Sequence, residues 1–291
     1  MDRNPDWKNT GWASRNGKAV RVSEVSRGLA CGCVCPDCGG QLVAKKGPQR
    51  AHHFAHANTV DCDRLGESAL HLACKDVIQE YREMALPDVV ASDGRYDGTR
   101  SYEHQDHDLV ASSKRVRFGA VRSEHAMGSI IPDITATANG HTLCVEIKVT
   151  HASDDEKSRY YETLQQSAIE VDASDLPRDA LRHVIKERVI DCTKHKRWIY
   201  NTRAAERLES CTKKDRGPVF VDCPLPVRAL LDNIPNNGWR NAARRSAHSR
   251  NVHWLYNCLY CRHSVCITDE HIFCDATEDA TRHYTSFPGG L

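Results

Sequence analysis

The 291-residue sequence contains no long apolar run. No stretch approaches the roughly 20 apolar residues that a membrane-spanning helix needs. The opening stretch, MDRNPDWKNTGWASRNGKAV, lacks the apolar core of a secretory signal peptide, and no lipidation motif is present. We therefore expect a cytoplasmic protein without a membrane role, in a reducing compartment where its 14 cysteines serve as thiols or metal ligands rather than disulfides.

The chain also lacks an excess of charge of either sign, because 40 basic and 39 acidic residues leave a formal charge of +1. Any nucleic-acid binding must then come from a local basic patch. One segment, Asn233 to Thr268, contains no acidic residue and carries Arg240, Arg244, Arg245 and Arg250. We predict that these arginines contact a nucleic-acid backbone, with a plain solvated surface as the alternative.

No internal repeat or long low-complexity tract divides the chain, so its organisation has to be inferred from motifs and periodicity. We predict a zinc-finger-like element over residues 1–62, an α/β core over residues 63–205 and a Cys/His/Arg-rich module over residues 206–291. Within the core, ESALHLACKDVIQEYREM has helical periodicity, and it is followed by strands, a second helix and another strand. This order predicts a mixed sheet flanked by helices.

A first cluster of metal-ligating residues lies in CVCPDCGGQLVAKKGPQRAHHFAHA. Cys35 and Cys38 have the C-x2-C spacing of a zinc knuckle, and His53 and His56 would complete four ligands. The ligand set stays open, because other candidates lie nearby: His52, Cys31, Cys33 and Cys62. A closed site of four ligands is structural, so we expect this Zn²⁺ to have no catalytic part.

A second cluster lies in NCLYCRHSVCITDEHIFC near the other end of the chain. Cys258 and Cys261 repeat the C-x2-C spacing, and Cys274 and His271 are the candidates we choose to close a second zinc site. Cys266 and His283 compete for the same positions. With the preceding arginines, this module would bind DNA or dock a partner protein.

The stretch IIPDITATANGHTLCVEIK predicts a tight β-hairpin, because Asn139 and Gly140 both tolerate the positive φ of a type I′ turn. Counting outward from that turn places Asp133 opposite Glu146, with Lys148 on the same face. Opposed carboxylates repel, so the arrangement suits a divalent cation such as Mg²⁺ or Mn²⁺ between them.

The predicted helix before the hairpin carries Glu67, His71 and Lys75 at positions i, i+4 and i+8. These three residues share one side of the helix. Either they form an exposed stripe, or Glu67 and His71 point over the carboxylate cluster.

Four segments together resemble a known family: CPDCGGQLVAKKGPQRAHHFAH, ESALHLACK, IIPDITATANGHTLCVEIKVTH and KSRYYETLQQSAIEVDAS. They are similar to the competence protein CoiA-like family, in which a zinc-finger-like element precedes a restriction-endonuclease-like nuclease domain of the PD-(D/E)xK type. The resemblance covers roughly residues 30 to 175. It implies that Asp133 and Glu146 hold a catalytic metal, that Lys148 is the catalytic lysine and that Glu67 is the acidic residue of the leading helix. His71 matches a recurring position of that helix.

These observations lead to the hypothesis of a metal-dependent nuclease that hydrolyses DNA, in DNA uptake and processing or in defence against foreign DNA. A Mg²⁺ or Mn²⁺ ion held by Asp133, Glu146 and the carbonyl of Ile147 would activate water, and Lys148 would act as a base or stabilise charge on the phosphate. The alternatives are a non-catalytic zinc-containing protein that binds nucleic acid or a partner, and a nuclease that is inactive until a partner binds. The oligomeric state stays open.

Overall fold

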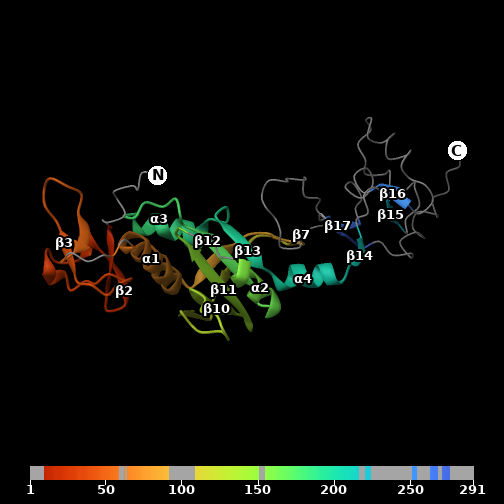
Figure 1. The fold of residues 1–291 in the computed structure, drawn as a ribbon, viewed down its shortest axis with the longest axis horizontal. Coiled ribbons are helices and arrows are strands. Elements are labelled where there is room, and N and C mark those ends of the chain that lie inside the picture. Colours follow the sequence, from red (N-terminus) through yellow and green to blue (C-terminus); the bar gives the residue numbers. More distant parts are fainter. Residues whose placement is uncertain are drawn as a thin grey trace, which may run out of the picture. The chain divides into compact units, whose positions relative to one another are not determined.

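The structure is a computed structural model that describes residues 10–58, 62, 64–91, 109–150, 155–215, 220–223, 251–253, 263–267 and 271–275 (Figure 1). The chain divides into two compact units, the first formed by Met1–Pro87 with Ser113–Tyr200 and the second by Asp88–Ser112 with Asn201–Leu291. The boundaries expected at residues 62 and 205 stay predictions. None of the helices in the described part of the chain has the length and apolar character required to cross a membrane.

The centre of the first unit is a five-stranded mixed sheet in the order β13-β12-β11-β10-β9. Its strands are β9 (Ala120–Ser123), β10 (Ile134–Ala138), β11 (His141–Lys148), β12 (Ala168–Asp172) and β13 (Lys196–Tyr200). Strands β11 and β12 are parallel, and the other neighbours are antiparallel. Because a parallel pair needs a crossover connection, the helix between β11 and β12 is a consequence of this topology.

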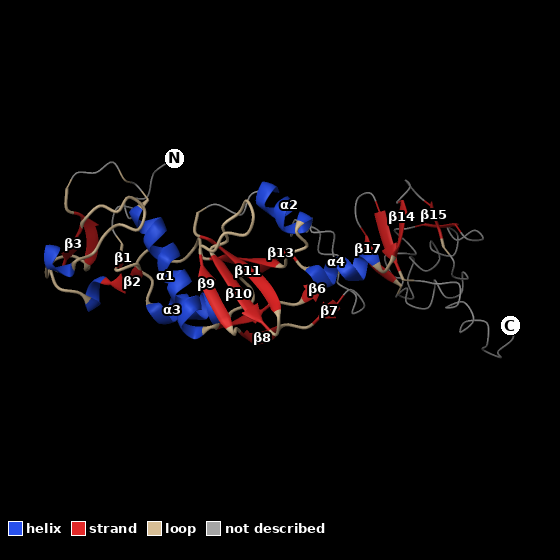
Figure 2. Cartoon of the chain, turned by 90° about the horizontal axis from the view of Figure 1, so that it is seen from below, coloured by secondary structure: helices blue, strands red, loops and turns tan. Residues whose placement is uncertain are grey.

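Helices cover both faces of this sheet (Figure 2). They are α1 (Leu65–Tyr81), α2 (Asp155–Thr163), α3 (Arg182–Lys186) and the π-helix η5 (Glu187–Asp191). Helix α1 buries Leu70, Val77 and Ile78 in the same core as Val145 and Ile147 of β11. On the other face, Tyr161 of α2 packs in a smaller core with Cys144, Ala168 and Ile199. The predicted mixed sheet flanked by helices is therefore confirmed.

The amphipathic pattern of LPRDALRHVIKERVID predicts a helix over the whole segment, but regular helix begins only at Arg182. The preceding residue, Leu181, is extended with ψ 150°. The carbonyl of Ala180 accepts the indole N–H of Trp12 at 2.9 Å instead of a helical backbone N–H. A tertiary hydrogen bond to the N-terminal element thus replaces the first turn of this helix.

The N-terminal element belongs to the first unit and contains two small antiparallel pairs, β1 with β2 and β3 with β4. Its elements are β1 (Trp12–Arg15), β2 (Lys18–Arg21), η2 (Val22–Glu24), η3 (Leu29–Cys31), β3 (Leu42–Lys45) and β4 (His53–His56). Leu42 and Phe54 are fully buried in a core of its own, together with Cys31, Cys33 and Cys35. A further pair in this unit joins β5 (Glu83–Leu86) to β8 (Lys114–Arg117).

The second unit contains one helix and several short strands in its described part. They are β6 (Val89–Val90), β7 (Leu109–Ala111), α4 (Thr202–Glu209), β14 (Thr212–Asp215), β15 (Phe220–Asp222), β16 (Asn251–His253), β17 (Ser264–Ile267) and β18 (His271–Cys274). Strands β14, β18 and β17 form an antiparallel sheet, and Leu208 and Val265 are buried in a small core. None of the cysteines whose side chains the structure describes forms a disulfide.

Candidate carboxylate site and metal centre

The predicted hairpin is confirmed in turn and register. Asn139 and Gly140 have φ values of 51° and 80°, and Ala138 pairs with His141 while Ile134 pairs with Val145. One step further out, this register sets Asp133 opposite Glu146. The turn, a local feature of the sequence, thus brings the two carboxylates to the same end of the sheet.

The Asp133 carboxylate receives two hydrogen bonds through Oδ2. The backbone N–H of Ile147 donates at 2.8 Å, and Nε2 of His71 on α1 lies at 2.9 Å. Burial by itself raises the pKa of Asp133, but the hydrogen bond and charge of His71 outweigh it, so the pKa lies below its usual value. Asp133 is therefore an ionised carboxylate at neutral pH.

The three predicted residues of α1, Glu67, His71 and Lys75, do not form a plain exposed stripe. His71 faces Asp133, and Lys75 is buried, with its ammonium 2.6 Å from Glu124. Glu67 accepts a hydrogen bond from the Thr150 hydroxyl, just beyond β11. Its carboxylate lies 3.8 Å from the guanidinium of Arg64. Helix α1 thus brings His71 to Asp133, and it brings Glu67 to Thr150 just beyond the end of β11.

Glu146 is almost completely buried, with 5% of its side chain exposed. Lys157 donates to Oε2 at 2.6 Å, and the Tyr161 hydroxyl donates to Oε1. Burial raises the pKa of Glu146, opposed by the Lys157 and Tyr161 hydrogen bonds and reinforced by the negative charge of Asp133. Lys157 and Tyr161 were not among the predicted site residues, although their i, i+4 spacing on the helix after the Glu-x-Lys strand is a usable signal.

The ammonium of Lys148 is held by Asp172, whose Oδ2 lies 2.8 Å from Nζ. Asp172 is the register partner of Lys148 on the parallel strand β12. Although burial opposes it, hydrogen bonds from Lys148 and from Ser174 lower the pKa of Asp172 to about 2. Sequence reasoning missed Asp172. A usable signal was present, because Glu170 and Asp172 alternate along β12 as Glu146 and Lys148 do along β11, and the two pairs lie side by side in the parallel register.

The carboxylates of Asp133 and Glu146 are oxygen donors of the kind that Mg²⁺ or Mn²⁺ prefers, and the imidazole nitrogen of His71 lies beside Asp133. His71 Nε2 lies 2.9 Å from Asp133, and the Lys157 ammonium lies 2.6 Å from Glu146. Among the described residues, the groups of three or more metal-ligating side chains that come close together do not include these carboxylates. Binding an ion here would therefore require the carboxylate oxygens to exchange a protein hydrogen-bond partner for the metal.

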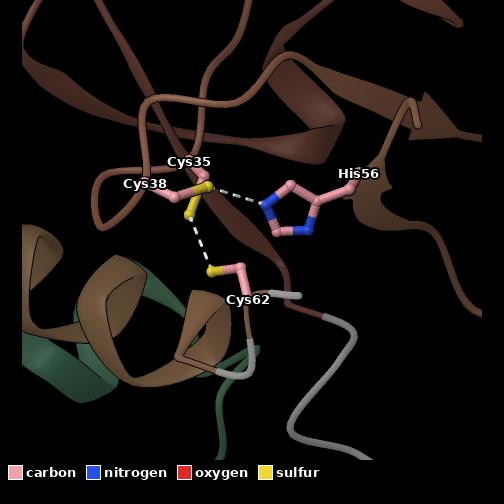
Figure 3. A group of neighbouring side chains, drawn as sticks. All are labelled: Cys35, Cys38, His56 and Cys62. Carbon is pink, nitrogen blue, oxygen red and sulfur yellow. Dashed lines mark hydrogen bonds between the residues drawn. The ribbon is translucent and has the colours of Figure 1, made fainter. Parts of the chain in front are cut away.

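A tighter cluster of metal-ligating atoms lies in the N-terminal element. Cys35, Cys38, His56 and Cys62 place their ligand atoms within 4.8 Å of one another (Figure 3). Cys35 Sγ lies 3.9 Å from Cys62 Sγ, and Cys38 Sγ lies 3.3 Å from His56 Nε2. A tetrahedral Zn²⁺ separates two sulfurs by about 3.8 Å and a sulfur from a nitrogen by about 3.5 Å. The donor set and its spacing therefore fit zinc.

This cluster corrects the predicted ligand set, because Cys62 takes the place given to His53. His53 and His56 begin and end the four-residue strand β4. Residues three apart on a strand point to opposite faces, so these two histidines cannot approach the same ion. His53 instead engages the carbonyl of Ala51 through Nδ1 at 2.9 Å.

The competing cysteines have other contacts. Cys31 donates to the carbonyl of Leu42 and Cys33 to that of Cys31. Burial raises the pKa of Cys33 to about 12. Within the cluster, the backbone N–H of Gly40 lowers the pKa of the exposed Cys38 thiol, which favours the thiolate form that a metal binds. Burial raises the pKa of Cys35 and raises that of Cys62 to about 12, so without a metal these two thiols stay protonated.

The predicted C-terminal residues lie mostly beyond what the structure describes. Cys258, Cys261 and the four arginines Arg240, Arg244, Arg245 and Arg250 fall outside the described residues. His271 begins strand β18 and Cys274, which is buried, ends it. The second zinc site and the basic patch therefore stay predictions.

Residues 25–64 match the family model of the competence protein CoiA, N-terminal domain. This segment contains all four residues of the cysteine and histidine cluster and ends just before α1. The match confirms the resemblance to the CoiA-like family over this N-terminal segment. No curated protein and no solved structure matches the chain.

Proposed function

We propose that this CoiA-like protein is a divalent-metal-dependent nuclease that hydrolyses phosphodiester bonds in DNA, with a restriction-endonuclease-like core. The observation that carries the proposal is the hairpin register, in which Ile134 pairs with Val145, so that Asp133 and Glu146 each lie one position further along their strands. Strand alternation then places Lys148 on the same face of β11 as Glu146. Support comes from His71, which reaches Asp133 from α1, and from the family match, which suits a role in DNA uptake or processing. Defence against foreign DNA is the other setting for such an enzyme.

Each residue has a role that follows from its environment. Asp133, Glu146 and the carbonyl of Ile147 would hold Mg²⁺ or Mn²⁺, which when bound lowers the pKa of water and stabilises negative charge on the phosphate. Asp133 is ionised, but its Oδ2 must release His71 before that oxygen can bind a cation. Glu146 must release Lys157 before it can do so.

Lys148 had two proposed roles, as a base or as a source of positive charge. Its amine is hydrogen-bonded to a carboxylate that is ionised down to a pH of about 2. This ion pair fixes the position of the Lys148 ammonium beside the carboxylate site. We therefore assign Lys148 the second role, in which it orients the attacked phosphate and stabilises its charge.

Cleavage of supercoiled and linear DNA by the full-length protein in Mg²⁺ or Mn²⁺ tests the proposal, with single-stranded RNA as a second substrate. The variants are Asp133→Asn, which keeps the size of the side chain, and Lys148→Met. We expect each to lower the rate by about 100-fold or more. The control is Lys114→Met, an exposed lysine on β8, which should cleave like the wild type. Cleavage that survives in both site variants would refute the assignment.

One observation favours a second candidate, a nuclease that stays inactive until a partner binds. Both oxygens of Glu146 are engaged by protein donors, Tyr161 and Lys157. A partner that moved α2 would free this carboxylate. This second function is favoured if the purified wild type binds DNA without cleaving it and the Lys157→Met variant gains metal-dependent cleavage. If the wild type and the variant both bind DNA and neither cleaves it, the protein is a non-catalytic DNA-binding protein.

A further inference from the structure

The cysteine and histidine cluster and helix α1 meet directly in the chain. Cys62, which closes the cluster, precedes Arg64, the residue that caps α1, and the helix begins at Leu65. Figure 3 shows Cys62 at the start of this helix, facing the other ligands. A metal held by Cys62 therefore restrains the entry of the chain into α1.

A second contact runs through Asp37, which lies inside the knuckle between Cys35 and Cys38. The Ser68 hydroxyl donates to one Asp37 oxygen at 3.4 Å. The Cys62 thiol donates to the other oxygen at 3.6 Å, a contact that is lost when Cys62 binds a metal as the thiolate. The guanidinium of Arg64 lies 4.0 Å from the same carboxylate and 3.8 Å from Glu67. The knuckle is thus linked to the first turn of α1 by a short series of side-chain contacts.

Helix α1 has no side-chain cap of its own to fix its start. Its capping residue is Arg64, whose side chain makes no capping hydrogen bond. Ser, Thr, Asp or Asn would be favoured there. The Asp37 carboxylate, supplied from the knuckle, contacts Arg64 and the Ser68 hydroxyl and places a negative charge near this helix N-terminus, where the helix dipole favours it.

The first two turns of α1 carry the residues that meet the carboxylate site. Glu67 accepts from Thr150, next to β11, and His71 binds Asp133. We propose that metal binding at Cys35, Cys38, His56 and Cys62 sets the position of Glu67 and His71 at the carboxylate site, and that Asp37 and Cys62 are the positioning residues. The catalytic consequence rests on the proposed nuclease function, but the coupling between the two sites does not.

Hydrogen exchange of the full-length protein measures this coupling without any activity assay. Asp37→Ala keeps all four ligands, so zinc content should stay unchanged while exchange over residues 65–71 rises by about tenfold. Ser68→Ala, which removes only the link to Asp37, should give a smaller rise in the same residues. His53→Ala is the matched control, because His53 lies beside the cluster but outside it, and it should change neither zinc content nor exchange.

A second measurement follows the carboxylate site itself, by the binding of Mn²⁺ to the zinc-loaded protein. Asp37→Ala should weaken that binding several-fold, and Cys62→Ser, which also loses zinc, should weaken it further. Exchange over residues 65–71 that is the same in wild type, Asp37→Ala and Ser68→Ala would overturn the coupling, even if the wild type cleaves DNA. Faster exchange in these variants with no cleavage by the wild type would uphold the coupling and count against the nuclease.

Discussion

Replacing Lys157 by Met removes the cation from a buried carboxylate while keeping most of the side-chain volume. Glu146 is 5% exposed, and Lys157 Nζ lies 2.6 Å from its Oε2. Breaking one partner of a buried pair leaves an uncompensated charge, which costs about 3–5 kcal/mol. Because the Tyr161 hydroxyl still donates to the other oxygen, we expect a loss in the free energy of unfolding of about 3 kcal/mol.

A matched control exists on the surface of the same unit. Lys186 lies at the same distance, 2.6 Å, from Asp191, but about a third of each side chain is exposed. Pairs of this kind contribute about 0–1 kcal/mol. Lys186→Met should therefore lower stability by less than about 1 kcal/mol, although the ion-pair geometry is alike.

Urea denaturation in the presence of EDTA at pH 7 and pH 5 would measure both losses. Burial raises the pKa of Glu146 in the folded protein above its value in the unfolded chain. Protonation of Glu146 therefore stabilises the folded protein at low pH, and this stabilisation is lost as the pH rises through the folded pKa. The difference between Lys157→Met and wild type should accordingly shrink from pH 7 to pH 5. Added Mn²⁺ should stabilise Lys157→Met more than wild type if Glu146 is a metal ligand.

Equal losses in Lys157→Met and Lys186→Met would refute the reasoning from burial. A loss that is large but independent of pH would mean that packing of Lys157, and not the charge of Glu146, is responsible.

Two further predictions concern the frame around the site. Burial lowers the pKa of Lys196 to about 8. Between about pH 8 and pH 10.5 the unfolded chain therefore binds more protons than the folded protein, so the stability of the wild type should rise with pH by up to about 3 kcal/mol relative to Lys196→Met. Parallel curves of stability against pH for the two proteins would contradict this. A Cβ at Gly128, where φ is +61°, would overlap the Tyr160 hydroxyl, whereas Gly140 has a positive φ but open surroundings. Gly128→Ala should therefore lower the melting temperature more than Gly140→Ala. Equal losses would show that backbone strain alone, and not the overlap, lowers the melting temperature.

The hairpin and the helix before it could be predicted because their signals are local. Two consecutive residues that tolerate positive φ set the turn, and the turn sets the register that pairs Asp133 with Glu146. Helical periodicity likewise predicted α1 and its buried face. These features depend on residues close together in the chain, so no knowledge of the rest of the fold was needed.

The metal ligands could be predicted only in part. The C-x2-C knuckle of Cys35 and Cys38 is a local motif, but choosing between His53, His56 and Cys62 required the strand that separates the two histidines onto opposite faces. Strand alternation would have excluded the pair His53 and His56 if the strand itself had been predicted.

By itself, the sequence determined helix α1, the hairpin and its register, and the resemblance of the N-terminal segment to a known family. Only the tertiary structure decided which groups neutralise the site: Lys157 reaches Glu146 because α2 crosses over the sheet between two parallel strands, and Asp172 reaches Lys148 because β12 then pairs in register with β11. The physical reason is that ion pairs and metal clusters form between side chains far apart in the chain, whose meeting depends on how the buried faces pack and not on local spacing.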